Sequence, residues 1–271
     1  MSTSASRASE LLAAYDAQLR DHVPDPLPKG ASVERDGPLF RFFGLFGLGN
    51  RGFISYRDLA GLDGSDLDEL IARQVSVFAE RGERFEWKLH RHDRPPDLPH
   101  RLRASGFVPE DEETVVIARV DEIANRPLLP EEVVLREVTD RSDLDRIAAF
   151  ERAAWEDADE QTWIADMLEA ERTADPNGIS IVVAEAGSAI VCAGWVRFVS
   201  GTDFATLWGG ATLPAWRGRG IYRATVAHRA GLAARRGFGF LEVDASSDSR
   251  PILERLGFSA VTTTTPYVWS P

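Results

Sequence analysis

Apolar and polar residues follow two different spacings along the chain, and these spacings predict its strands and helices. In the second half, the turn-like sequence Ser200-Gly-Thr-Asp203 separates two apolar runs and predicts a hairpin. Gly237 follows the last long helical segment, where a residue tolerant of positive φ is favoured. We expect strands at 133–138, 179–185, 189–199, 204–213 and 238–244, and helices at 142–156, 161–173 and 220–236. This half therefore predicts a mixed α/β domain.

The first half contains a similar mixture of elements. Two prolines and several polar residues interrupt the apolar pattern in the segment 120–132, which reads VDEIANRPLLPEE. A chain of 271 residues is comfortable for two domains. We therefore predict one domain at 1–125 and a second at 126–271. In the first we expect helices at 5–19 and 66–81, apolar runs at 39–46 and 52–56, a strand at 84–89 and a β-rich run at 114–119.

The two halves share an order of elements. In each, a helix ends at Arg-Gly, a strand follows, and a helical segment then ends in Gly-Phe before a β-rich run. The loop of the first copy is about five residues longer. This recurrence predicts an internal repeat, although two βαβ-like units can also resemble each other by chance. The matching pairs are Arg81-Gly82 with Arg236-Gly237, and Gly106-Phe107 with Gly257-Phe258.

Composition narrows the class of protein. With 44% hydrophobic and 27% charged residues, the chain can bury substantial cores. A net charge of −12 argues against a general nucleic-acid binder, which needs clustered lysines and arginines. The single cysteine, Cys192, excludes an intrachain disulfide and a cysteine metal cluster, and its apolar surroundings favour a buried core residue over a reactive thiol. Met1 to Glu10 lacks a signal-peptide pattern, and no apolar run is long enough for a membrane span. We expect a cytoplasmic monomer or homodimer.

The segment from Ala211 to Arg223 concentrates the candidate chemistry. A strand ends there, Pro214 breaks the ladder, and two glycines precede a helix, so free backbone N–H groups would meet at the positive end of a helix dipole. Such a junction suits a phosphate. Arg217, Arg219 and Arg223 add positive charge within an acidic chain. The alternatives are a glycine-rich turn with solvated arginines and a dinucleotide-binding unit, which would need a third glycine.

This segment resembles the acetyl-CoA motif of the GNAT N-acetyltransferase family, Q/R-x-x-G-x-G/A. Residues 217–222 read Arg-Gly-Arg-Gly-Ile-Tyr and match its first two fixed positions. The preceding Leu207-Trp-Gly-Gly-Ala-Thr-Leu-Pro214 is similar to the family's splayed fourth strand, and Ser249 to Phe258 is similar to its terminal helix. The resemblance covers about 133–270. It implies an α/β (α+β) protein of two GNAT-like domains, each with a mixed, mostly antiparallel sheet flanked by helices.

The resemblance also implies a reaction. Acetyl-CoA would be the co-substrate, without a metal, and a primary amine of a small molecule or an exposed amino group would attack it directly. Backbone N–H groups of Gly218 to Tyr222 would bind the pyrophosphate, and edge groups near Ala211 would pair with the pantetheine arm. A backbone N–H on the same strand would stabilise the oxyanion. The expected coenzyme-binding residues are Ala211, Thr212, Leu213, Arg217, Gly218, Arg219, Gly220, Ile221, Tyr222, Arg223 and Ser246.

Two residues depart from the family pattern. Tyr222 stands where the family prefers Gly or Ala, so its side chain must turn away from the phosphates or crowd them. Leu253 aligns with the tyrosine that protonates the departing thiolate in many relatives. Protonation would then come from Tyr267 or from water, or would not be required. These departures keep open a second class of function, a non-catalytic acyl-CoA-binding sensor or interaction module.

The acceptor amine needs a base, directly or through water. Glu242 and Asp244 alternate along a predicted strand and share one face, which makes them candidate catalytic residues, or else a polar sheet face. The acidic segment 155–163 lies between two tryptophans and could attract a cationic amine, or could be a solvated loop. We name Trp155, Glu156, Asp159 and Trp208 as candidate acceptor-binding residues, although Trp208 is interpreted first as a core residue.

The first half shows no corresponding phosphate site. Before its second helix the sequence is acidic, with Asp66 and Asp68 at the positive pole that a phosphate would need. We therefore expect this half to bind no coenzyme and to contribute structure or part of the acceptor pocket. His90, His92 and His100 are interpreted as polar surface rather than metal ligands, since arginines surround them.

Overall fold

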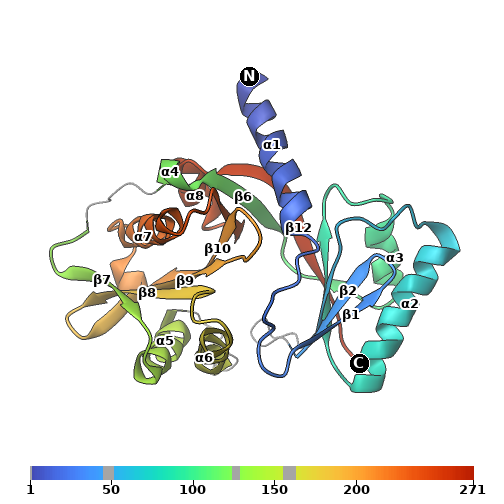
Figure 1. The fold of residues 1–271 in the computed structure, drawn as a ribbon, viewed down its shortest axis with the longest axis horizontal. Coiled ribbons are helices and arrows are strands. Elements are labelled where there is room, and N and C mark those ends of the chain that lie inside the picture. The colour runs from blue at the N-terminus through green and yellow to red at the C-terminus, as the bar shows by residue number, and fades with distance from the viewer. Residues whose placement is uncertain (1, 45–51, 124–128, 155–162) are drawn as a thin grey trace.

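The computed structural model describes residues 2–44, 52–123, 129–154 and 163–271. Figure 1 shows two groups of elements joined by long central strands. The N-terminal half begins with helix α1 and continues through short strands to helix α4, which packs against α7 of the other half (Figure 1). Its elements are α1 (Ser2–Gln18), β1 (Ser32–Asp36), β2 (Leu39–Phe43), β3 (Gly52–Ser55), α2 (Gly64–Arg81), β4 (Phe85–His90), α3 (Leu98–Ala104), β5 (Val108–Pro109), β6 (Glu113–Arg119) and α4 (Val120–Ile123).

The second group contains the elements of the C-terminal half. The hairpin and the helix end at Gly237 form as predicted, and Gly201 and Gly237 adopt φ of 73° and 84°. The elements are β7 (Val133–Val138), α5 (Arg141–Ala154), α6 (Ile164–Ala174), β8 (Ile179–Ala186), β9 (Ala189–Phe198), β10 (Phe204–Thr212), a 3₁₀ turn (Pro214–Trp216), α7 (Ile221–Arg235), β11 (Phe240–Ala245), α8 (Arg250–Leu256) and β12 (Ser259–Trp269).

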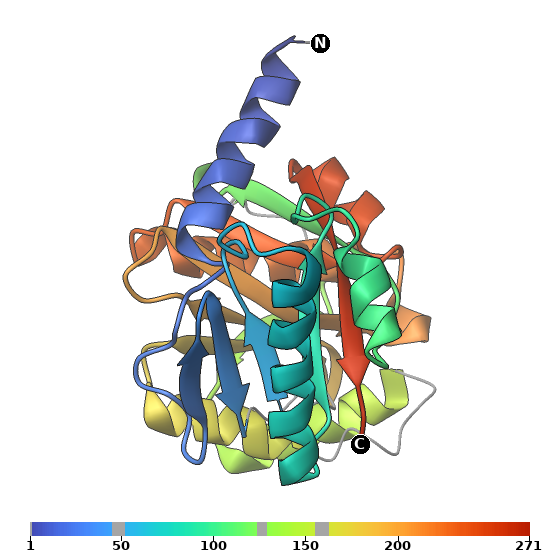
Figure 2. The same cartoon turned by 90° about the vertical axis from the view of Figure 1, so that its right-hand side faces the viewer.

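In the described part of the chain, the strands form one 12-stranded sheet in the order β1-β2-β3-β4-β12-β6-β11-β10-β9-β8-β7, with β5 beside β12. Two of its pairings are parallel, β3 with β4 and β10 with β11. The others are antiparallel, so the predicted fold class is confirmed: a mixed, mostly antiparallel sheet flanked by helices. Helices α2 and α3 lie over the outer face of the first group of strands (Figure 2). None of the described helices is both long and apolar enough to cross a membrane.

The two halves exchange their last long strands. β6 of the first half pairs with β11 of the second, and β12 of the second half pairs with β4 of the first. The registers of these pairings correspond. Val243 pairs with Val116, and Trp87 pairs with Tyr267. Trp87 and Val243 occupy equivalent positions 156 residues apart, and Val116 and Tyr267 occupy equivalent positions 151 residues apart. The five-residue difference between these spacings equals the extra length of the loop in the first copy. The exchange therefore follows the internal repeat.

Each end of the sheet has its own core. Helix α2 buries Leu67, Leu70 and Ile71, spaced as neighbours on one helix face, against Trp87 of β4. Helix α7 presents several alanines, which let it lie close to the central strands. Helix α1 lies over the junction of the halves, with Tyr15 packed near the central strand β6 (Figure 1). The boundary predicted at 125/126 falls in residues outside the described part of the chain, and it stays a prediction.

Candidate functional site

The two parallel strands β10 and β11 diverge at the centre of the sheet. Their pairing is limited to Phe204–Thr206 on β10 and Phe240–Glu242 on β11. Beyond that point β10 is paired only with β9, as far as the pair of Thr212 with Cys192. The edge of β10 that faces away from β9 is therefore left open from Leu207 onward. A strand edge of this kind can pair with an extended ligand.

A bulge in β10 shapes this opening. Its residues Gly209 and Gly210 have φ of 65° and 95°, a backbone region that favours glycine. A Cβ atom at Gly209 would lie 2.7 Å from the Trp195 ring, and one at Gly210 would lie 2.7 Å from the Tyr222 ring. The ring of Tyr222 thus packs against the bulge. Arg229, which is buried in α7, donates to the carbonyl oxygens of Trp195 and Trp208 at 3.1 and 2.9 Å and holds the bulge in place.

The segment from Arg217 to Arg223 forms a loop with free donors. Gly218 and Gly220 have φ of 76° and 79°, and Gly220 caps α7 without a side-chain hydrogen bond. The first amide with a helical acceptor is that of Ala224, which donates to Gly220 at 3.0 Å. No N–H group from Gly218 to Arg223 has an acceptor among the described residues. Because these donors meet at the positive end of a 15-residue helix, the loop fits a phosphate.

The predicted coenzyme arginines separate into two groups. Arg217 and Arg223 line the large cavity described below. The Nε of Arg217 donates to the Thr212 carbonyl oxygen at 3.0 Å, which ties the loop to the end of β10. Arg219 does not line the cavity; its guanidinium lies over the Trp216 ring at 4.7 Å. Arg217 is therefore better positioned than Arg219 for the expected contact with the phosphates.

One cavity of about 1640 Å³ connects this loop with the space between the two halves. The second half supplies β10, the loop and α8, while the first half supplies the segment 22–28 together with residues of β3, β4 and β6. Of the predicted coenzyme residues, Leu213 and Arg219 are absent from its wall. Those that line it are Ala211, Thr212, Arg217, Gly218, Gly220, Ile221, Tyr222, Arg223 and Ser246.

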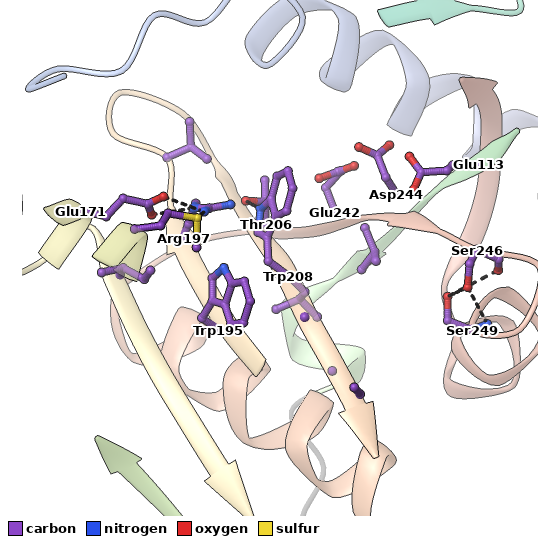
Figure 3. Close-up of a pocket in the computed structure, with 18 of the residues that line it drawn as sticks. Glu113, Glu171, Trp195, Arg197, Thr206, Trp208, Glu242, Asp244, Ser246 and Ser249 are labelled. Carbon is purple, nitrogen blue, oxygen red and sulfur yellow. Dashed lines mark hydrogen bonds and ion pairs between the residues drawn. The ribbon is translucent and has the colours of Figure 1, made fainter. Parts of the chain in front are cut away.

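Carboxylates of both halves gather in the middle of the cavity. Figure 3 shows Glu242, Asp244 and Glu113 one after another along its wall. Glu242 and Asp244 share a face of β11, as predicted, and Glu113 comes from the exchanged strand β6. Lys88 of β4 forms an ion pair with Asp244. Lys88 and Asp244 are 156 residues apart and so occupy equivalent positions in the two halves.

Burial changes the acidity of these groups. Glu242 is 5% exposed, and its Oε1 has no hydrogen-bond partner among the described residues. Burial raises the pKa of Glu242 well above its ordinary value; Asp244 adds to the rise, and Lys88 opposes it. Burial and then the charge of Asp244 raise the pKa of Glu113 to about 7. A carboxylate with a raised pKa is a stronger base, so both groups suit proton transfer, Glu113 near neutral pH.

The Lys88–Asp244 pair gives a first prediction. Replacing Lys88 by Met should destabilise the protein by about 3 kcal/mol or more, because Asp244 is left beside two other carboxyl groups without a cation. Adding Asp244→Asn should recover part of that loss, which a double-mutant cycle in urea would measure. A loss below about 1 kcal/mol for Lys88→Met would mean that the pair contributes as little as an exposed one.

Other predicted site residues lie elsewhere. Tyr267 is 2% exposed and packs in the core of the first half, opposite Trp87, so it does not line the cavity and its suggested role as the acid is corrected. Because side chains alternate along β12, Tyr267 points to the face of the sheet that α2 and α3 cover. Leu253, on the inner face of α8, is fully buried. Trp208 does line the cavity, but the Arg197 guanidinium covers its ring at 4.4 Å. Trp155, Glu156 and Asp159 lie outside the described residues.

The sequence analysis allowed the first half a part in the acceptor pocket but named none of its residues. Glu86, Lys88 and Glu113 reach the cavity because the halves exchange strands. The internal repeat could have indicated two of these residues, Glu86 and Lys88. The shift of 156 residues places Glu86 over Glu242 and Lys88 over Asp244, so charged residues occupy equivalent strand positions in both copies.

The corresponding opening in the first half is filled. Strands β3 and β4 pair in parallel over Gly52–Ile54, and β3 then ends at Ser55. The buried hydroxyl of Tyr56 donates to Asp93 at 2.6 Å, and Arg20 pairs with the same carboxylate at 2.5 Å. His90 is buried beside this network, 2.9 Å from the Tyr15 hydroxyl, so its assignment to the surface was wrong. Within the described residues no group of side chains could hold a metal ion.

Comparisons with known proteins agree with this arrangement. The model of the acetyltransferase (GNAT) family matches residues 143–258. A GCN5-related N-acetyltransferase from Kribbella flavida has a TM-score of 0.66 at 15% identity, covering 99% of this chain and 96% of that one. A tandem GNAT protein from the clavulanic acid biosynthesis pathway has a TM-score of 0.65 at 14% identity, with 99% and 96% covered. No curated protein matches. At these identities the solved structures show the fold alone.

Proposed function

We propose that the chain transfers an acetyl group from acetyl-CoA to a primary amine, since the model of the acetyltransferase (GNAT) family matches residues 143–258. The observation that carries the proposal is the divergence of β10 and β11 directly beside a loop of free N–H donors. The open strand edge suits an amide-containing arm, and the loop suits the diphosphate to which that arm is attached.

The residues present fit the coenzyme. A Cβ atom at Gly218 would meet no other atom within 4 Å, so the space above the loop is open for phosphate oxygens. Arg217 and Arg223 add positive charge at the same end of the cavity. Tyr222 leaves the loop clear because its ring packs against Gly210. A bound thioester supplies the activated acetyl group, and the protein supplies orientation and exclusion of water.

Glu242 is the base in this proposal. It pairs with Thr206, the last residue of β10 before the strands diverge, so its side chain lies at the apex of the opening. The unpartnered Oε1 accepts a proton from the ammonium form of the acceptor. The nitrogen lone pair then attacks the thioester carbonyl carbon, the C–S bond breaks, and the second nitrogen proton leaves to solvent. The sulfur departs as a thiolate, which water protonates, because neither Tyr267 nor Leu253 reaches the cavity.

The first half provides one wall of the acceptor site. It contributes Glu86, Lys88 and Glu113 to the cavity, while its own strand opening is filled by Tyr56, Asp93 and Arg20. We therefore propose that only the second half binds acetyl-CoA. The tandem GNAT protein of the clavulanic acid pathway, which has a similar fold over its whole length, is consistent with a two-half arrangement.

A combined binding and activity experiment tests this function. Acetyl-CoA should raise the melting temperature, and at least one primary amine in a broad panel should release free thiol from it. Stabilisation without thiol release from any amine would favour the acyl-CoA-binding sensor, for which the buried Leu253 is the supporting observation. Absence of stabilisation at millimolar acetyl-CoA would contradict both functions.

A further inference from the structure

Between its two halves the cavity holds more carboxyl groups than the proposed transfer reaction needs. One carboxylate at the apex of the strand opening would suffice as a base, yet Glu113 lies further along the same wall (Figure 3). Resting on the proposed function, we propose that the acceptor is a small amine with at least two cationic nitrogens, and that Glu113 binds the nitrogen that is not acetylated.

The cations that line the cavity form no ion pair with Glu113 or Glu242 in the described part of the chain. Lys88 pairs with Asp244, and Arg197 pairs with Glu171 at 2.7 Å. The remaining arginines of the wall, Arg217, Arg223 and Arg255, belong to the coenzyme loop, α7 and α8.

The buried Oε1 of Glu242 is an independent sign of a ligand. It lines the cavity, is nine-tenths buried or more, and has no partner in the described part of the chain. A buried acceptor of this kind is costly unless something donates to it. An ammonium group supplies both the donors and the charge. The apex of the opening thus has a place for one cationic nitrogen.

Strand geometry sets the distance to the second nitrogen. Glu242 pairs with Ile117 of β6, and Glu113 lies four residues further along β6 on the same face. At about 3.3 Å per residue and 4.8 Å between strands, the two Cα atoms are roughly 14 Å apart. Side chains that lean toward each other shorten this span, so nitrogens on the order of 6 to 12 Å apart would reach both carboxylates.

Apolar side chains line the cavity beyond Glu113, on the side of β12 and β3. Pro266 lies on β12 opposite Lys88, and Phe53 faces the cavity from β3. Neither side chain has a polar atom. A linear diamine or triamine can place one nitrogen at Glu242 and another at Glu113 by passing the Lys88–Asp244 ion pair, whereas a monoamine of equal length would leave Glu113 unpaired.

Matched amines test this inference. We would compare 1,4-diaminobutane, 1,6-diaminohexane and spermidine with 1-aminobutane and 1-aminohexane as acceptors in the thiol-release assay. At least one diamine or triamine should exceed its monoamine counterpart in kcat/KM by 10-fold or more. Glu113→Gln should reduce this ratio to about 2-fold or less by raising KM for the diamine, with kcat nearly unchanged. Glu112→Gln removes the same charge one residue away, outside the cavity wall, and should leave the ratio as it was.

The outcomes separate this inference from the proposed function. Equal turnover of monoamines and diamines, or an unchanged ratio in Glu113→Gln, would overturn the inference and leave acetyl transfer standing. If acetyl-CoA binds but no amine releases thiol, transfer fails, and calorimetry of the coenzyme A complex decides the inference instead. In that titration, spermidine binding that Glu113→Gln weakens at least 10-fold supports it, and absence of binding at 10 mM rejects it.

Discussion

Replacing Arg217 by Glu is expected to weaken acetyl-CoA binding by about 100-fold or more. The change removes a cation from the end of the cavity that holds the free N–H donors and puts an anion there. It loses a charge-assisted hydrogen bond and adds repulsion, together about 3 kcal/mol. Isothermal titration calorimetry measures the effect directly. Arg219→Glu should have a smaller effect, because Arg219 lies over Trp216 and outside the cavity wall.

The first half offers a matched control. Asp66 lies in the first turn of α2, the helix that corresponds to α7 in the repeat. Asp66→Ala and Asp68→Ala should leave the acetyl-CoA affinity within 2-fold of the parent. If these two changes abolished binding while Arg217→Glu did not, the coenzyme would belong to the first half, and the assignment of the site would be wrong.

Glu242→Gln should lower kcat by about 100-fold to 10,000-fold with every amine while acetyl-CoA affinity stays the same. The side chain keeps its shape but can no longer accept the proton. Turnover reduced less than 5-fold would remove Glu242 from the role of base. This pattern differs from that of Glu113→Gln, which should act on KM and only with acceptors that carry a second cation.

Loss of folding does not account for the expected effect of Glu242→Gln. The pKa of Glu242 is raised in the folded protein, so the folded state holds this proton more tightly than the unfolded chain does. Its contribution favours folding at low pH and is lost as the pH rises through the raised pKa. A neutral glutamine avoids that loss. The variant should therefore melt at or above the parent temperature at pH 8, as differential scanning calorimetry would show.

The sequence was sufficient where local chemistry decides the structure. The 200–203 turn, the positive φ of Gly237 and the loop 217–222 all follow from residue types with narrow conformational preferences. The same holds for the face shared by Glu242 and Asp244, because strand residues alternate. Elements of this kind depend little on the rest of the chain.

The exchange of β6 and β12 could not be predicted from local residue preferences. Both strands carry apolar faces that fit either half of the sheet, so the choice of neighbour depends on packing across the whole molecule. That choice sends Tyr267 into a core and brings Glu113 beside Asp244. The sequence therefore did not indicate where Tyr267 and Glu113 lie, whereas the proposed base Glu242 and the proposed coenzyme loop do line one cavity.

The number of acetyl-CoA molecules bound per chain tests the central claim most directly. The opening between β10 and β11 is free, and the equivalent opening beside β3 is filled by Tyr56 and its partners. Calorimetric titration of the 271-residue chain should therefore give one acetyl-CoA per chain, and Arg217→Glu should remove that single binding event. Two molecules per chain, or one that persists unchanged in Arg217→Glu, would contradict the assignment of the coenzyme to the second half.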